Sequence, residues 1–147
     1  MQNSFIADSI LIDALEPLSV SLPCGNGLFL LRQGEVPTGL YIIRSGAASL
    51  LMKAENGDEE AHFRVGAGSI LGLPAIVAKE PYSLSAMACE RSDVRFVQAE
   101  AFNELMQEQP SLFPKVLEVL AAEVRSARLV LTGFLGKLGS RPSRVVN

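Results

Sequence analysis

The chain has 147 residues, 48% of them hydrophobic and 20% charged, a composition typical of one globular domain and unlike that of a disordered protein. Its net charge of −3 includes no block of Lys or Arg, so we expect no direct nucleic-acid binding by this chain, because phosphate contacts supply most non-specific affinity. The N-terminus carries no signal-peptide pattern, and the most apolar stretch, residues 129–135, is too short to cross a bilayer.

Cysteine and histidine are scarce. Cys24 and Cys89 lie far apart without CxxC spacing, which fits two reduced thiols in a cytoplasmic protein, and two are too few for the four thiolates of an iron–sulfur cluster. His62 is the sole histidine, so neither the histidine cluster of a metal-dependent cupin nor a Ser–His–Asp triad can be assembled. We therefore expect no metal, no cofactor, no catalytic residue and no enzyme activity.

Predicted elements follow in chain order. Residues 4–15 space their apolar side chains at helical intervals, which predicts a short amphipathic helix. From residue 28 to about residue 97, short apolar clusters alternate with turns rich in Gly, Pro and Asn, a pattern that predicts an antiparallel sandwich or barrel. The clusters cover residues 28–33, 39–46, 48–53, 61–65, 83–88 and 94–98, and the clearest hairpin signal between them is Asn56-Gly57.

Helical spacing returns over residues 100–109 and then continues as a heptad pattern with alternating steps of four and three. The pattern runs through Phe113, Leu117, Leu120, Val124, Ala127, Leu131, Phe134 and Leu138. Such a helix either packs on its own barrel or forms a two-stranded coiled coil with a second copy. Since about 25 helical residues extend roughly 37 Å, more than one side of a small barrel can cover, we favour a homodimer. Its interface would consist of Leu117, Leu120, Val124, Ala127, Leu131 and Phe134.

These motifs together carry a family resemblance. The stretch QGEVPTGLYIIRSG (33–46), the Gly-rich segment 68–72 with the short helix after it, and the strands near 85–88 and 94–97 follow one another in a known order. Over about residues 16–138 the chain resembles the effector, cyclic-nucleotide-binding-like domain of the CRP/FNR family of bacterial transcription regulators. The resemblance implies a mainly β fold with flanking helices, a double-stranded β-helix (jelly-roll, cupin-like) barrel followed by a long dimerisation helix.

The implied domain limits are 1–110 for the barrel with its N-terminal helix and 111–139 for the dimerisation helix. Residues 140–147 would be a tail or the start of a missing helix-turn-helix domain, because a recognition helix does not fit in so few residues.

The resemblance also implies a ligand site. In relatives that bind cyclic AMP, a Glu binds the ribose and an Arg binds the cyclic phosphate; here those positions fall on Leu73 and Tyr82. A neutral side chain does not replace the charge-assisted bonds of an Arg, so we expect no tight binding of cyclic AMP. Residues 68–88 are called the cradle below. The other expected ligand-binding residues are Gly72, Pro74, Ala75 and Ser83 in the cradle and Arg128 and Thr132 on the dimer helix.

Two functions therefore remain open. In one, the cradle binds a small, relatively apolar or weakly anionic effector, with Tyr41, Ile76, Ser85 and Arg125 as further neighbours, and signals through the dimer helix. In the other, Leu73 and Tyr82 fill the former nucleotide space, and the chain is a ligand-free dimerisation or protein-interaction module. A filled cavity would favour the second function and an open one the first.

Overall fold

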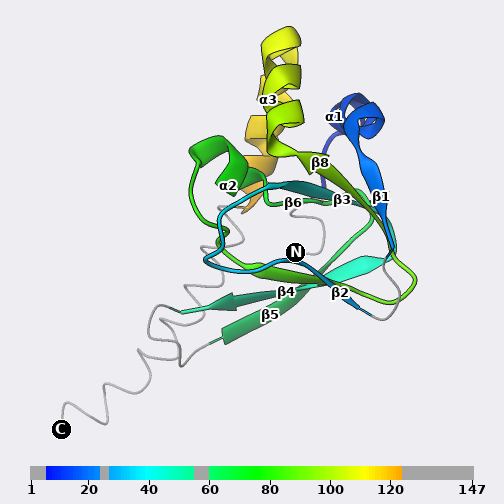
Figure 1. Cartoon of the computed structure of the whole chain (residues 1–147), viewed down its shortest axis with the longest axis vertical. Helices are drawn as coiled ribbons and strands as arrows, with labels where there is room; N and C mark the ends of the chain where they lie inside the picture. The colour runs from blue at the N-terminus through cyan, green and yellow to red at the C-terminus, as the bar shows by residue number, and fades with distance from the viewer. Residues whose placement is uncertain (1–5, 24–26, 55–59, 124–147) are drawn as a thin grey trace, which may run out of the picture.

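The structure is a computed structural model that describes residues 6–23, 27–54 and 60–123 (Figure 1). Its elements are, in order, α1 (Ser9–Leu15), η1 (Glu16–Leu18), β1 (Val20–Leu22), β2 (Leu28–Leu31), β3 (Gly39–Ser45), β4 (Ala47–Lys53), β5 (Glu60–Gly66), β6 (Ile70–Leu71), α2 (Leu73–Ala78), β7 (Ser85–Ala88), β8 (Asp93–Gln98), α3 (Ala99–Glu108) and η2 (Pro110–Leu112). Residues 113–123 are also helical and are called the C-terminal helical segment below.

The strands form two antiparallel sheets. Sheet one has the order β1-β8-β3-β6 and sheet two the order β2-β7-β4-β5. Tyr41 in β3, for example, lies opposite Phe96 on one side and Leu71 on the other. The predicted mainly β fold with flanking helices is thereby confirmed.

The boundaries differ from the prediction in several places. Helix α1 begins at Ser9 instead of residue 4, because the Asp8 side chain accepts a hydrogen bond of 2.8 Å from the Ile10 N–H and caps the helix there. The short strands β1 and β6 were not predicted, since runs of two or three residues are too short to show a period. The predicted Asn56-Gly57 turn lies outside the described residues.

Strand β3 of sheet one is buried on both faces. In β3, Tyr41 and Ile43 point into the barrel and belong to the core between the sheets, whereas Leu40 and Ile42 point outward beneath the helices. Strands covered on both sides read as continuous apolar runs, which is the pattern of residues 40–43. Strand β5 in sheet two instead alternates exposed and covered positions, because its outer face meets solvent.

The helices form a layer over the outer face of sheet one (Figure 1). This second core contains Leu11 and Leu15 of α1, Leu73 and Ile76 of α2, Phe102 and Leu105 of α3, and Leu112, Val116 and Val119 near the C-terminus. The C-terminal helical segment therefore shares a core with the barrel instead of standing apart from it. A salt bridge of 3.0 Å from Lys115 Nζ to Asp8 Oδ2 also ties it to the start of α1.

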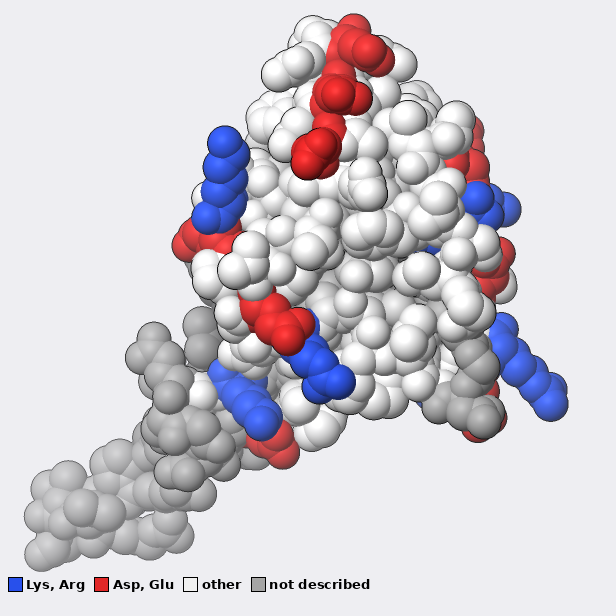
Figure 2. Space-filling model, in the orientation of Figure 1, with Lys and Arg blue, Asp and Glu red and all other residues white. Residues whose placement is uncertain are grey.

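The surface in Figure 2 shows acidic side chains gathered at the end of the molecule formed by α3, where Glu100, Glu104 and Glu108 are all exposed. Lys and Arg are scattered over the rest of that face without forming a patch (Figure 2). In the part of the chain that the structure describes, no helix combines the length and apolar character needed to cross a membrane.

Candidate functional site

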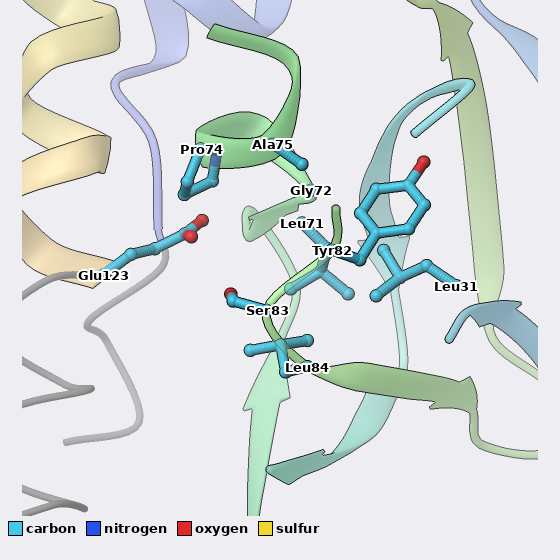
Figure 3. A pocket seen from close by; sticks show the side chains of 9 residues that line it. All are labelled: Leu31, Leu71, Gly72, Pro74, Ala75, Tyr82, Ser83, Leu84 and Glu123. Atoms are coloured by element: carbon cyan, nitrogen blue, oxygen red, sulfur yellow. The ribbon is translucent and has the colours of Figure 1, made fainter. Parts of the chain in front are cut away.

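A cavity lies beside α2, where strands β2 and β6, the loop after α2 and the end of the C-terminal helical segment meet (Figure 3). Its free space is about 250 Å³ including the mouth, of which only about 10 Å³ admits the centre of a water molecule. The interior thus has room for about one water. The lining residues are Leu31, Leu71, Gly72, Pro74, Ala75, Tyr82, Ser83, Leu84 and Glu123.

Gly72 allows the cradle to close around its backbone. Its φ of +89° is the left-handed conformation that side-chain-bearing residues rarely adopt. A Cβ at this position would lie 3.1 Å from Cε1 of Tyr82 and 3.2 Å from the Gly39 carbonyl oxygen. A glycine is therefore required where α2 begins beside the tyrosine ring.

Tyr82 is held by a complete set of hydrogen bonds. Its hydroxyl donates to the Gly39 carbonyl oxygen at 2.7 Å and accepts from the Thr38 and Gly39 N–H groups at 3.1 and 3.3 Å. Its own N–H donates to the Glu35 carbonyl oxygen at 3.0 Å. The side chain is only 5% exposed, and its hydroxyl points away from the cavity, so only the ring lines the site (Figure 3).

Leu73 does not line the cavity, which corrects the sequence-based expectation. It is fully buried in the second core together with Ile76, because the first turn of α2 directs both side chains toward the helix layer. Tyr41 packs in the barrel core with its ring 5.0 Å from that of Phe96, and burial raises the pKa of its hydroxyl to about 12. Ser85 accepts a hydrogen bond from the Gln33 N–H at 2.9 Å and does not reach the cavity either.

The structure brings together Gly72, Pro74, Ala75, Tyr82 and Ser83 of the expected ligand-binding residues. Arg125, Arg128 and Thr132, which were expected to complete the site from the dimer helix, lie outside the described residues. The same is true of Val124, Ala127, Leu131 and Phe134 of the expected interface. Whether these residues act as expected stays a prediction.

Glu123 is the lining residue that the sequence analysis missed. It is 8% exposed, its Oε1 atom has no hydrogen-bond partner, and its carboxylate points toward Pro74 and Ser83 (Figure 3). Burial raises the pKa of this carboxyl well above its ordinary value, because the charged form loses its hydration. One signal was available: position 123 continues the steps of four and three from the buried residues Leu112, Val116 and Val119.

No metal centre is found among residues 6–23, 27–54 and 60–123, since no three His, Cys, Asp or Glu side chains gather there. His62 lies on β5 with an exposed side chain, its Nε2 atom 3.8 Å from Glu60 Oε1. It is an exposed surface residue, and among the described residues it belongs to no cluster that could bind a metal.

Comparisons with known proteins agree with this architecture. The family model described as "Cyclic nucleotide-binding domain" matches residues 24–109, more than half of the chain. The transcriptional activator protein Anr of Pseudomonas protegens is 29% identical over 115 residues, which are 78% of this chain and 47% of that protein. The chain thus spans less than half the length of this curated relative.

Two solved structures illustrate the fold. Thermus thermophilus catabolite activator protein matches with a TM-score of 0.71 at 22% identity, over 86% of this chain and 60% of that chain. The sensor domain of the transcriptional regulator DNR from Pseudomonas aeruginosa matches with a TM-score of 0.61 at 18% identity, over 82% of this chain and 81% of that chain. At these identities the likeness concerns the fold alone.

Proposed function

Because the chain belongs to the cyclic nucleotide-binding domain family, with relatives among the CRP/FNR regulators, we propose that it is a sensory domain that responds to a small effector other than cyclic AMP. The cavity carries this proposal. It retains the glycine, proline and serine of a ligand cradle, but its lining within residues 6–23, 27–54 and 60–123 includes no Lys, Arg or His to bind a phosphate.

Size supports the exclusion of cyclic AMP. Sites for ligands of drug size usually enclose about 300–1,000 Å³, and this cavity is smaller even with its mouth included. The position at which the family resemblance expects an arginine is occupied by the buried ring of Tyr82. Losing charge-assisted bonds of about 1.5–3 kcal/mol each moves a micromolar site toward millimolar affinity.

The proposed signal travels along the C-terminal helical segment. Glu123 lines the cavity, while Leu117 and Phe113 on the same segment are 49% and 39% exposed and can meet a second copy. In the proposed homodimer, Val124, Ala127, Leu131 and Phe134 continue this contact, and Thr132 extends the ligand site. A ligand that binds one helix position better than another then shifts the population of dimer geometries.

Native mass spectrometry of protein purified from its host tests this proposal, because it measures the oligomer mass and any retained ligand together. We expect a dimer mass with a small added mass. Calorimetry with cyclic AMP up to millimolar concentration should give no heat of binding. A monomer mass, or micromolar binding of cyclic AMP, would contradict the proposal.

A second candidate function is a ligand-free dimerisation or protein-interaction module. The observation in its favour is the interior of the cavity, where only about 10 Å³ is open to a water centre. A dimer that carries no added mass, and that gives no heat with a broad panel of small molecules, would favour this alternative.

A further inference from the structure

Among the described residues, the cavity contains one ionisable side chain that the fold leaves without a partner. Glu123 is more than nine-tenths buried, and its Oε1 atom has no hydrogen-bond partner. An unpaired buried carboxylate is unfavourable, so a position that holds one is poorly explained by packing alone. Its neighbours along the inner face of the segment, Val116 and Val119, are apolar, as the core there requires.

The remaining polar groups of the cavity are few. Of the nine lining residues in the part of the chain that the structure describes, only Tyr82, Ser83 and Glu123 have polar side chains. The Tyr82 hydroxyl is already bonded to Thr38 and Gly39 and points away. A ligand would therefore meet the Glu123 carboxylate and the Ser83 hydroxyl, which both lie on the α2 side of the cavity (Figure 3).

We propose that this cavity selects a small organic cation, a primary ammonium group on a short apolar body, which donates hydrogen bonds to the Glu123 carboxylate and the Ser83 hydroxyl. The inference rests on the proposed function, since it takes the cavity to be the effector site. The aliphatic walls formed by Leu31, Leu71 and Leu84 would contact the apolar body. The enclosed part of the cavity admits about one water molecule, so the ammonium group would enter it and the apolar body, a few carbon atoms or one ring, would lie in the open mouth.

The opposite charge does not fit. A phosphate or carboxylate group in the cavity would lie against Glu123 in a poorly hydrated space, where like charges repel more strongly than in water. An ammonium group instead supplies the missing partner. A cation beside the Glu123 carboxyl would lower its raised pKa, because it would stabilise the charged form that burial disfavours.

Titration calorimetry of the full chain with three ligands that share one body tests the inference. The ligands are phenethylamine, 2-phenylethanol and 3-phenylpropionate, which differ only in carrying an ammonium, a hydroxyl or a carboxylate group; cyclic AMP is the fourth probe. We expect the amine to bind at least ten-fold more tightly than the other three. Glu123→Gln, which keeps the side-chain shape, should weaken amine binding at least ten-fold.

Glu118→Gln is the matched control, because Glu118 is an exposed carboxylate on the same helical segment. Its amine affinity should equal that of the wild type. Ser83→Ala should weaken the amine by a smaller factor than Glu123→Gln, since it removes a neutral acceptor. Circular dichroism of each variant establishes that it is folded before its affinity is compared.

The possible failures are distinguishable. Amine binding that is unchanged in Glu123→Gln would overturn the inference, as would tighter binding of the carboxylate or of cyclic AMP. Binding of 2-phenylethanol alone, or of 3-phenylpropionate alone, would overturn the inference and leave the effector function standing. If none of the four probes binds, the amine assignment is overturned, and native mass spectrometry then decides separately between an unknown effector and the ligand-free module.

Discussion

The C-terminal helical segment has two apolar faces with opposite surroundings. Val116 and Val119 on its inner face are almost completely buried in the core between the helices and sheet one, whereas Phe113 and Leu117 on its outer face are 39% and 49% exposed. Both faces have the same spacing of four and three residues. Periodicity alone therefore does not distinguish a helix that completes a core from one that awaits a partner.

This difference teaches that the segment has two separate tasks. The inner face adds to the stability of each chain, and the outer face is available for association. Glu123 lies where the inner face passes from the core to the cavity. Substitutions on each face should therefore change different measurements, and the following predictions use that separation.

The largest effect is expected for Val116→Asp on the inner face. The wild-type side chain is fully buried, and a carboxylate there would have neither water nor a cation beside it. We expect a loss of about 4 kcal/mol or more in the free energy of unfolding, a large share of the roughly 5–15 kcal/mol that stabilises an ordinary domain. Urea denaturation followed by circular dichroism measures this. A variant that unfolds at the wild-type urea concentration would show that the inner face is not part of the core.

Leu117→Asp on the outer face should leave the fold intact and weaken the dimer. Each copy would lose one partly buried leucine contact and bring a charge toward its symmetry mate, a combined loss of about 3 kcal/mol, or roughly a hundred-fold in dissociation constant. Sedimentation at several concentrations gives the dissociation constant, and circular dichroism tests the fold. Val124→Asp should act in the same direction; a dimer unchanged in both variants would refute the proposed seam.

Glu123→Gln should change the pH dependence of stability. The folded pKa of Glu123 lies well above the ordinary value of 4.5, so the folded state keeps this proton to higher pH than the unfolded state. Wild-type stability should therefore fall by about 1.4 kcal/mol per pH unit as pH rises from 4.5 to the folded pKa, and stay level above it. Chemical denaturation across this range should show a shallower slope for the Gln variant. Equal slopes would show that Glu123 is not buried as described.

The smallest effect is expected from the ion pair between Asp8 and Lys115. The pKa of Asp8 is lowered, first by the hydrogen bond from the Ile10 N–H and then by Lys115, so its stabilising effect is present above pH 3.8 and is lost as pH falls through the folded pKa. Lys115→Ala should lower the melting temperature slightly, and less so in high salt. Asp8→Asn, which keeps a capping acceptor, should resemble Lys115→Ala, whereas Asp8→Ala should cost more.

The fold was largely readable from the sequence because its main signals are local. The continuous apolar run of residues 40–43 and the Gly-rich turns indicated a strand-rich barrel, and the helical spacing over 100–109 located α3 within one residue at each end. The start of α1 was missed, since the apolar spacing continues upstream of Asp8, and the cap that begins the helix there is visible only in the structure. Strands β1 and β6 exist only because longer partners, β8 and β3, lie beside them.

The candidate site was less readable because it depends on which way side chains point. Gly72, Pro74, Ala75, Tyr82 and Ser83 were placed correctly around the cavity by the family resemblance. Leu73 was misplaced, since one step along α2 turns a side chain from the cavity to the core. Glu123 was overlooked because a glutamate near a heptad pattern usually faces solvent, and only the packing of Leu112, Val116 and Val119 shows that this one does not.

The hydroxyl of Tyr82 has a consequence for how such a domain can change over evolutionary time. It forms hydrogen bonds with three main-chain groups at the beginning of β3. Replacing the tyrosine with an arginine would leave two N–H donors and a carbonyl acceptor without these bonds, a cost that no phosphate contact offsets in the ligand-free protein. Substitutions at Thr38 and Gly39 would leave these main-chain groups in place, so an arginine at position 82 would need a new partner for them elsewhere. The tyrosine therefore makes a phosphate-binding arginine hard to introduce here by a single substitution.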